Sequence, residues 1–248
     1  EFRRVLFRSQ LLIDLIQKYI AEPFLGLSQG LGAVLIVTVF VQIFWFFGIH
    51  GPNVLAPVLE GIWGQAQLIN IDIFQKGYEG KTGTAAVLAA IDDGKAYMWV
   101  RGSFDAFAWF GGSGGTIVLI IAILLFSKRA DYLTVGKLSL GPGIFNINEP
   151  IMFGLPVVLN PIMFIPFVIA PLVATTIGWV ATYLGLVAPV SQQVAWVTPP
   201  LLLSFLATGA DWRAPIVALV CMVVTFLIWT PFVIAANKMD PALGESEQ

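Results

Sequence analysis

The sequence has few charges, one cysteine and one histidine. Asp, Glu, Lys and Arg make up only 11% of its 248 residues, whereas soluble domains carry about 25%. The lone cysteine, Cys221, excludes an internal disulfide, and the net charge of −2 argues against a nucleic-acid-binding surface. No cluster of His, Cys, Asp and Glu has the spacing of metal ligands. We therefore expect neither a metal ion nor a cofactor.

The chain instead contains long runs of apolar residues. Hydrophobic residues make up 58% of the chain, and its mean hydropathy is +0.86. The runs do not alternate apolar and polar residues as the strands of a membrane barrel do. We predict an all-α membrane protein that crosses the membrane several times. Its candidate transmembrane helices are residues 31–49, about 113–127, 172–187 and 214–236.

The two ends of the chain differ from this apolar middle. Residues 1–9 (EFRRVLFRS) match the translation of the sequencing adapter GAGTTCAGACGTGTGCTCTTCCGATCT, so we interpret them as non-native; the alternative is a basic arm at the membrane surface. Residues 10–30 form a connector, in which residues 10–25 predict an amphipathic helix that ends near Pro23. Residues 237–248 form a polar tail.

Two segments, 50–65 and 144–161, are broken by proline and glycine, and we predict that they form re-entrant hairpins. Five prolines recur between 150 and 171, which argues against an uninterrupted helix there. Residues 54–110 hold only short apolar pieces, and we expect residues 128–137 to form a polar cytoplasmic loop. Paired broken segments are typical of a transport site.

Glu149 and His50 are the candidate catalytic residues. From Ile151 to Leu186 no residue is charged, so Glu149 lies at the mouth of a long apolar run, where an ionisable group is costly and rare. Pro150 favours extended backbone at Glu149. Two alternatives remain open: the amides of a helix N-terminus satisfy the carboxylate, and His50, the sole histidine, simply bonds to backbone.

Amide and aromatic side chains near these residues are candidates for substrate binding. Asn53, Asn146 and Asn148 offer donors and acceptors that suit a polyhydroxyl ligand. Trp196 has the flat ring that stacks on a sugar, although tryptophans of membrane proteins mostly belong to interfacial belts. The glycine-rich run 111–115 lacks the lysine of a nucleotide-binding loop, and close helix approach is its alternative role.

Several strings of the chain are distinctive: FGIHGPN (47–53), FGGSGGT (110–116), NINEPIMFGLPVVLNPIMFIPFVIAP (146–171), VTPP (197–200) and ATGADWRA (207–214). Through these strings the chain resembles the enzyme IIC permeases of the bacterial phosphotransferase system, lactose/cellobiose family. The similarity extends from about residue 10 to 237 and corresponds to the C-terminal half of such a permease.

This resemblance implies a fold and a mechanism. Residues 31–236 would form a transport domain with two re-entrant hairpins, which carries a disaccharide such as cellobiose or lactose across the bacterial inner membrane. Enzyme IIB, a partner, would then phosphorylate the sugar from its own cysteine, so Cys221 is not that residue. His50 and Glu149 would lie at the hydroxyl that receives phosphate, with Asn148 and Trp196 beside them.

The resemblance leaves three matters open. The family forms homodimers in the membrane lipid, and the half of the permease that makes most of that contact would be missing from this chain. Residues 72–86 (DIFQKGYEGKTGTAA) depart from the family pattern, which leaves the identity of the sugar undecided. A proton-coupled sugar transporter, with Glu149 and His50 as the proton relay, is the alternative function.

Overall fold

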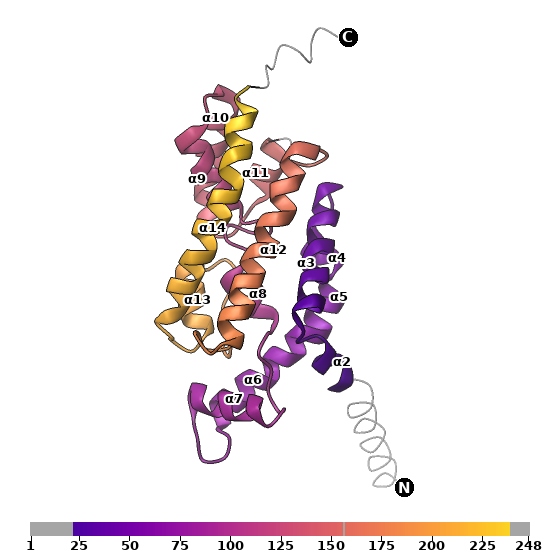
Figure 1. Ribbon diagram of the computed structural model, residues 1–248, viewed down its shortest axis with the longest axis vertical. Coiled ribbons are helices and arrows are strands. Elements are labelled where there is room, and N and C mark those ends of the chain that lie inside the picture. The colour runs from indigo at the N-terminus through magenta and orange to yellow at the C-terminus, as the bar shows by residue number, and fades with distance from the viewer. Residues whose placement is uncertain (1–21, 156, 239–248) are drawn as a thin grey trace.

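The computed structural model describes residues 22–155 and 157–238. The adapter-like residues 1–9, most of the 10–30 connector and residues 239–248 of the tail lie outside this part. Within it the chain is helical and contains no strand, apart from one isolated bridge between Tyr78 and Lys81. The helices form an elongated bundle (Figure 1). They are α2 (Glu22–Leu27), α3 (Leu31–Phe46), α4 (Gly51–Val54), α5 (Ala56–Val58), the π-helix η2 (Leu59–Gly64), α6 (Gln65–Lys76), α7 (Gly83–Asp92), α8 (Arg101–Phe107), α9 (Thr116–Phe126), α10 (Ala130–Ile144), α11 (Glu149–Gly154), α12 (Pro161–Tyr183), α13 (Pro200–Ala207) and α14 (Arg213–Ala236).

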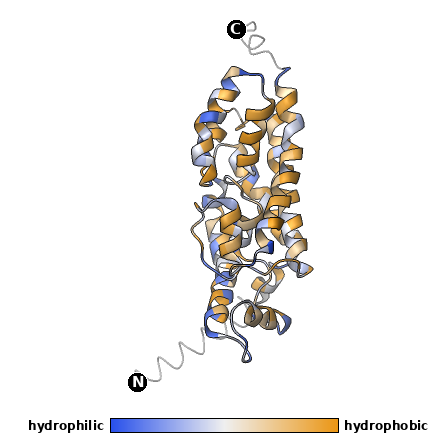
Figure 2. Ribbon diagram, turned by 90° about the vertical axis from the view of Figure 1, so that its left-hand side faces the viewer, coloured by the Kyte–Doolittle hydropathy of each residue, from blue (hydrophilic) through white to orange (hydrophobic). Residues whose placement is uncertain are grey.

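Two of the described helices, α12 and α14, are long and apolar enough to cross a membrane. They pack along each other, and small buried residues such as Ala174 on α12 and Ala218 on α14 permit this close approach. The ribbon is hydrophobic along most of the long helices (Figure 2). The predicted span at 214–236 therefore exists, and residues 172–183 of the predicted span 172–187 belong to α12.

Helix α3 runs antiparallel to α12. The Phe46 ring at its end lies 4.2 Å from the Phe164 ring near the start of α12. At the other end, the Trp179 indole donates a hydrogen bond to the Gln29 carbonyl at 2.9 Å. The predicted span at 31–49 is shorter than expected, because Gly48 adopts a positive φ of 76° just after α3 ends. Helix α3 thus brings the residues that follow it, 47–54, beside the start of α12.

The second predicted span, at about 113–127, is wrong, because the helix found there, α9, is too short to cross a membrane. It has only 11 residues, which correspond to about 16 Å, well below the roughly 30 Å of a hydrocarbon core. The cause lies in the preceding glycines, because Gly114 and Gly115 have φ angles of 94° and 66° that a helix cannot contain. Most of α9 is buried against α10 and α14. It is therefore an internal helix of the bundle.

Two further predictions about helices were wrong, and a third was right only in part. Residues 130–137 are not loop but the first half of α10. The predicted interruption of residues 150–171 is present, because α11 ends at Gly154 and α12 begins at Pro161, but α12 itself continues through Pro166 and Pro171. Helix α2 extends to Leu27, beyond the expected end near Pro23. The π-helix η2 and the short α4 and α5 agree with the expected interruption of the 50–65 segment.

The α6–α7 hairpin projects from one end of the bundle (Figure 1). It includes most of the unusual segment 72–86 and has a small apolar core of its own around Val87 and Ala90. Its contact with the bundle is close, since a Cβ on Gly209 would lie 2.7 Å from the Phe74 ring. The hairpin lies outside the lining of the cavity described next.

Candidate functional site

A cavity of about 320 Å³ lies where the loops after α3, α8 and α10 meet. All six side chains that the sequence singles out line it: His50, Asn53, Asn146, Asn148, Glu149 and Trp196. The bundle therefore brings together residues from three distant parts of the chain. The remaining lining consists of Pro52, Arg101, Asp105, Trp109, Gly112 and Ser113.

His50 is held by its own backbone surroundings. The next residue, Gly51, packs directly on α3: a Cβ there would lie 2.2 Å from the Val41 carbonyl oxygen, so only glycine fits. The His50 Nδ1 atom accepts a hydrogen bond from the Asn53 backbone N–H at 3.2 Å. An accepting Nδ1 carries no proton, so in the neutral ring the proton is on Nε2. The imidazole thus presents a donor at Nε2.

Glu149 faces that donor. Its Oε1 lies 3.8 Å from His50 Nε2, and the two side chains are 46% and 38% exposed. The expectation of extended backbone at Glu149 was wrong, because Glu149 is the first residue of α11; the non-helical turn lies just before it, where Asn146 has a φ of 63°. No hydrogen bond reaches the Glu149 carboxylate within the described residues, so helix amides do not satisfy it there.

Asn146 and Asn148 connect the loops of the site through side-chain hydrogen bonds to their backbone. The Asn146 Oδ1 accepts the Gly111 N–H at 2.8 Å, and its Nδ2 donates to the carbonyls of Trp196 and Thr198 at 2.6 and 2.8 Å. Both amide hydrogens of Asn146 are therefore used within the protein. The Asn148 Nδ2 donates to the Ser113 carbonyl at 3.0 Å, which leaves its Oδ1 without a partner among the described residues.

The glycine-rich run 111–115 is the wall against which these asparagines pack. A Cβ on Gly112, whose φ is 97°, would lie 2.7 Å from the Asn148 Cγ. The glycine-rich run thus lets the backbone approach the Asn148 side chain closely. Close approach was the alternative role that the sequence offered for this run, in place of nucleotide binding.

Asn53 and Trp196 are the more accessible of the six residues. The Asn53 side chain is exposed and its amide makes no hydrogen bond within the described residues. Trp196 is 54% exposed, and its ring lies beside the cavity while its carbonyl is fixed by Asn146. Both side chains are free to contact a ligand.

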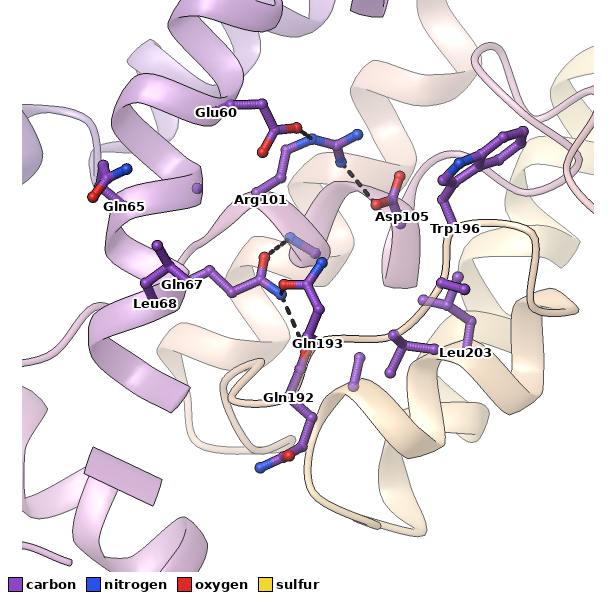
Figure 3. A pocket seen from close by; sticks show the side chains of 15 residues that line it. Glu60, Gln65, Gln67, Leu68, Arg101, Asp105, Gln192, Gln193, Trp196 and Leu203 are labelled. Carbon is purple, nitrogen blue, oxygen red and sulfur yellow. Dashed lines mark hydrogen bonds and ion pairs between the residues drawn. The ribbon is translucent and has the colours of Figure 1, made fainter. Parts of the chain in front are cut away.

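Sequence reasoning missed Arg101 and Asp105. The Arg101 Nη1 donates to Asp105 Oδ2 at 2.8 Å, and its Nε donates to Glu60 Oε1 at 2.9 Å (Figure 3). The guanidinium also lies 4.9 Å from the centroid of the Trp109 ring. A signal was present in the sequence: an oppositely charged i,i+4 pair inside the mostly apolar stretch 96–110.

The donors of this site suit an uncharged polar ligand better than a metal ion. Within residues 22–155 and 157–238, no group of three or more His, Cys, Asp and Glu side chains is placed to hold a metal. The cavity instead combines amide, imidazole, carboxylate and guanidinium groups with two indole rings. Such a lining binds hydroxyl groups through hydrogen bonds and ring faces through stacking.

Known proteins resemble this chain in sequence and in fold. The family model described as phosphotransferase system, EIIC, matches residues 6–171. A cellobiose-specific EIIC component of Lactococcus lactis subsp. lactis is 58% identical over 92% of the chain and 47% of its own length. An oligo-beta-mannoside-specific EIIC component of Bacillus subtilis is 36% identical over 95% of the chain and 50% of its own length.

A solved structure agrees with these relatives. The transporter ChbC, the IIC component from the N,N'-diacetylchitobiose-specific phosphotransferase system, matches with a TM-score of 0.82 and 32% identity, over 94% of this chain and 51% of that one. The chain spans about half the length of the relatives it matches. Its helical membrane fold is that of this transporter. The chain belongs to the EIIC family of the phosphotransferase system.

Proposed function

We propose that the chain is the sugar-binding transport part of a phosphotransferase-system permease. It binds a disaccharide in the cavity between His50 and Glu149 and presents one hydroxyl for phosphorylation by an EIIB partner. Two findings support this proposal. The chain belongs to the EIIC family, and its relatives are named as specific for cellobiose, oligo-beta-mannoside and lactose. The protein works as a multi-pass component of the bacterial inner membrane.

The observation that carries the proposal is the 3.8 Å separation between His50 Nε2 and Glu149 Oε1. This gap accommodates one hydroxyl oxygen at about 2.8 Å from each atom, the ordinary length of a hydrogen bond. The imidazole donates to that oxygen and the carboxylate accepts its proton. A bound hydroxyl is then oriented for attack on the phosphoryl group of the EIIB phosphocysteine. The oxygen–phosphorus bond forms, the sulfur–phosphorus bond breaks with the cysteine thiolate as leaving group, and Glu149 takes up the proton that the hydroxyl loses.

The other lining residues divide into two roles. Asn53, Asn148 and Trp196 contact the sugar, because each keeps a free acceptor, donor or ring face toward the cavity. Asn146 already donates both amide hydrogens to backbone carbonyls, so its role is to position the loops that carry Trp196 and Gly111. The phosphoryl donor is a cysteine of EIIB, and the working permease is a homodimer in lipid.

Binding by the purified chain is the first test. Radiolabelled cellobiose should bind to the chain in detergent, and excess unlabelled cellobiose should displace it. Phosphorylated EIIB, charged from phosphoenolpyruvate, should then convert the bound sugar to a sugar phosphate. Absence of binding, with the chain folded as judged by its helical circular dichroism, contradicts the proposal.

A transport assay distinguishes this proposal from the alternative of a proton-coupled transporter. In proteoliposomes, uptake that requires phosphoenolpyruvate-charged EIIB inside the vesicle and yields sugar phosphate supports the permease of a phosphotransferase system. Uptake of unmodified sugar that follows an imposed pH gradient, with no requirement for EIIB, supports the transporter that uses Glu149 and His50 as a relay.

A further inference from the structure

Ser113 is a polar residue of the cavity to which the mechanism above gives no role. It is only 5% exposed, and it lines the same cavity as His50 and Glu149. Within residues 22–155 and 157–238 its hydroxyl makes no hydrogen bond, yet its Oγ is not sealed in the interior as the unpartnered Ser139 Oγ on α10 is. The Ser113 hydroxyl is therefore a nearly buried, free donor that opens into the cavity.

The backbone around Ser113 adds further free donors. In the turn that precedes α9, the N–H groups of Ser113 and Gly114 have no hydrogen-bond partner in the described part of the chain. Buried N–H groups without a partner are rare. Gly112 and Gly114, on either side of Ser113, have positive φ angles of 97° and 94°, and successive N–H groups in such turns form concavities that bind anions. The run thus offers one hydroxyl and two neighbouring N–H groups.

This donor group is fixed beside the reacting carboxylate. The Asn148 Nδ2 donates to the Ser113 carbonyl at 3.0 Å, and Asn148 directly precedes Glu149 in the chain. The close approach of Gly112 to Asn148 holds the same contact from the other side of the turn. Ser113 therefore lies next to the residue that takes the proton from the sugar hydroxyl.

The cavity has no spare positive charge for a phosphoryl group. Among the described residues that line it, the one guanidinium, Arg101, is paired with Asp105 at 2.8 Å and with Glu60 at 2.9 Å. With His50 neutral, the lining holds two carboxylates and one guanidinium, a net charge of −1. A phosphoryl group in transfer brings more negative charge on its oxygens. Preorganised neutral donors are the remaining means of stabilising that charge.

We propose that Ser113 is a catalytic residue that contacts the phosphoryl group during transfer. This inference rests on the proposed function. The Ser113 hydroxyl and the N–H groups of Ser113 and Gly114 donate to the non-bridging phosphoryl oxygens. Meanwhile the sugar oxygen bonds to phosphorus, the sulfur–phosphorus bond of EIIB breaks with the thiolate as leaving group, and Glu149 takes the hydroxyl proton. The glycine-rich run is thus an anion site for a phosphoryl group, without the lysine of a nucleotide-binding loop.

The test separates the rate of transfer from the binding of sugar, both measured on the full chain in detergent. Single-turnover transfer from phosphorylated EIIB to bound cellobiose gives the rate, and equilibrium binding of cellobiose gives the affinity. Ser113→Ala removes the hydroxyl and Ser113→Thr keeps it. Ser139→Ala is the matched control, because it removes a buried, unpartnered hydroxyl that lies outside the cavity. The unfolding midpoint of each variant shows whether the fold is retained.

We expect transfer by Ser113→Ala to slow about 10- to 100-fold, the loss of one hydrogen bond to a charged group, while cellobiose affinity stays within about twofold. Ser113→Thr should regain most of the lost rate, and Ser139→Ala should match wild type in both measurements.

Three outcomes overturn the inference while the proposed function survives. They are an unchanged rate in folded Ser113→Ala, equal losses of rate and affinity in that variant, which would place the hydroxyl on the sugar, and a folded Ser113→Thr that binds cellobiose normally but is as slow as Ser113→Ala. Failure of the wild-type chain to bind cellobiose or to yield sugar phosphate instead contradicts the proposed function itself.

Discussion

The imidazole of His50 and the carboxylate of Glu149 face each other across 3.8 Å, and neither is held in place by the other. His50 is oriented by the Asn53 backbone N–H, and Glu149 is the first residue of α11, with no hydrogen bond to its carboxylate among the described residues. Each side chain can therefore be replaced without moving its neighbour. This independence makes the pair suitable for single substitutions that remove one chemical role at a time.

Glu149→Gln should separate phosphorylation from binding. The amide keeps an oxygen that accepts a hydrogen bond from a sugar hydroxyl but cannot take up its proton. Loss of a general base costs about 10²- to 10⁴-fold in rate. We expect that loss in phosphoryl transfer from EIIB, with cellobiose affinity reduced less than tenfold. Glu79→Gln, at an exposed glutamate in the α6–α7 hairpin, is the control. Equal losses in rate and affinity would assign Glu149 to binding alone.

Substitutions of His50 should distinguish its two nitrogen atoms. Asparagine is a good helix N-cap, so His50→Asn keeps an acceptor for the Asn53 N–H but removes the Nε2 donor and the ring, whose centroid lies 4.7 Å from that of Trp45. His50→Ala removes the acceptor as well. We expect both variants to lose sugar binding at least tenfold, and His50→Ala to be less stable than His50→Asn by about 0.5–1 kcal/mol. Chemical unfolding and binding measured on the same preparations check this. Wild-type affinity in His50→Asn would show that Nε2 does not contact the sugar.

The candidate site residues chosen from the sequence lie together in the fold, whereas several of the predicted helix bounds were wrong. Glu149, His50, Asn148 and Trp196 were identified from short distinctive motifs, and the fold places them on one cavity. Helix α14 was predictable because Pro215 lies in its first turn, where proline is tolerated, and its apolar run is long enough to span. These features depend on local composition, which a sequence displays directly.

Features that depend on packing were not predictable. Pro166 and Pro171 deprive α12 of two backbone donors, yet the helix continues between α3 and α14, since packed apolar helices tolerate proline better than exposed ones. The partnership of Arg101 with Glu60 joins residues 41 positions apart, on α8 and on a π-helix that composition does not reveal.

Gly112→Ala should disturb the site by direct contact. Its new Cβ would lie 2.7 Å from the Asn148 Cγ, so Asn148 must move. Gly80→Ala is the matched control, because Gly80 also has a positive φ, of 75°, but no atom within 4 Å of its added Cβ. We expect the control to cost about 1 kcal/mol and Gly112→Ala about 1–3 kcal/mol more, with sugar binding weakened only in the latter. Equal unfolding free energies would show that the loop yields without strain.

Asp211 should make the stability of the chain depend on pH at the N-terminal end of α14. Burial raises the pKa of this carboxyl, but hydrogen bonds from Arg213 and from the Ala188 and Arg213 backbone outweigh that effect, so its pKa lies below the ordinary value. The folded state therefore binds this proton less readily than the unfolded chain, whose pKa is about 3.9. The stabilisation is present above that value and is lost as pH falls through the folded pKa.

Asp211→Asn isolates this contribution. We expect the variant to be less stable by about 1–2 kcal/mol at pH 7, and the difference from wild type to shrink steadily as pH falls below about 4. Unfolding midpoints in detergent, measured between pH 3 and 7 at constant ionic strength, give this difference directly. A gap that stayed constant with pH would mean that the loss comes from the altered cap geometry, and that proton binding by Asp211 is the same in the folded and unfolded chain.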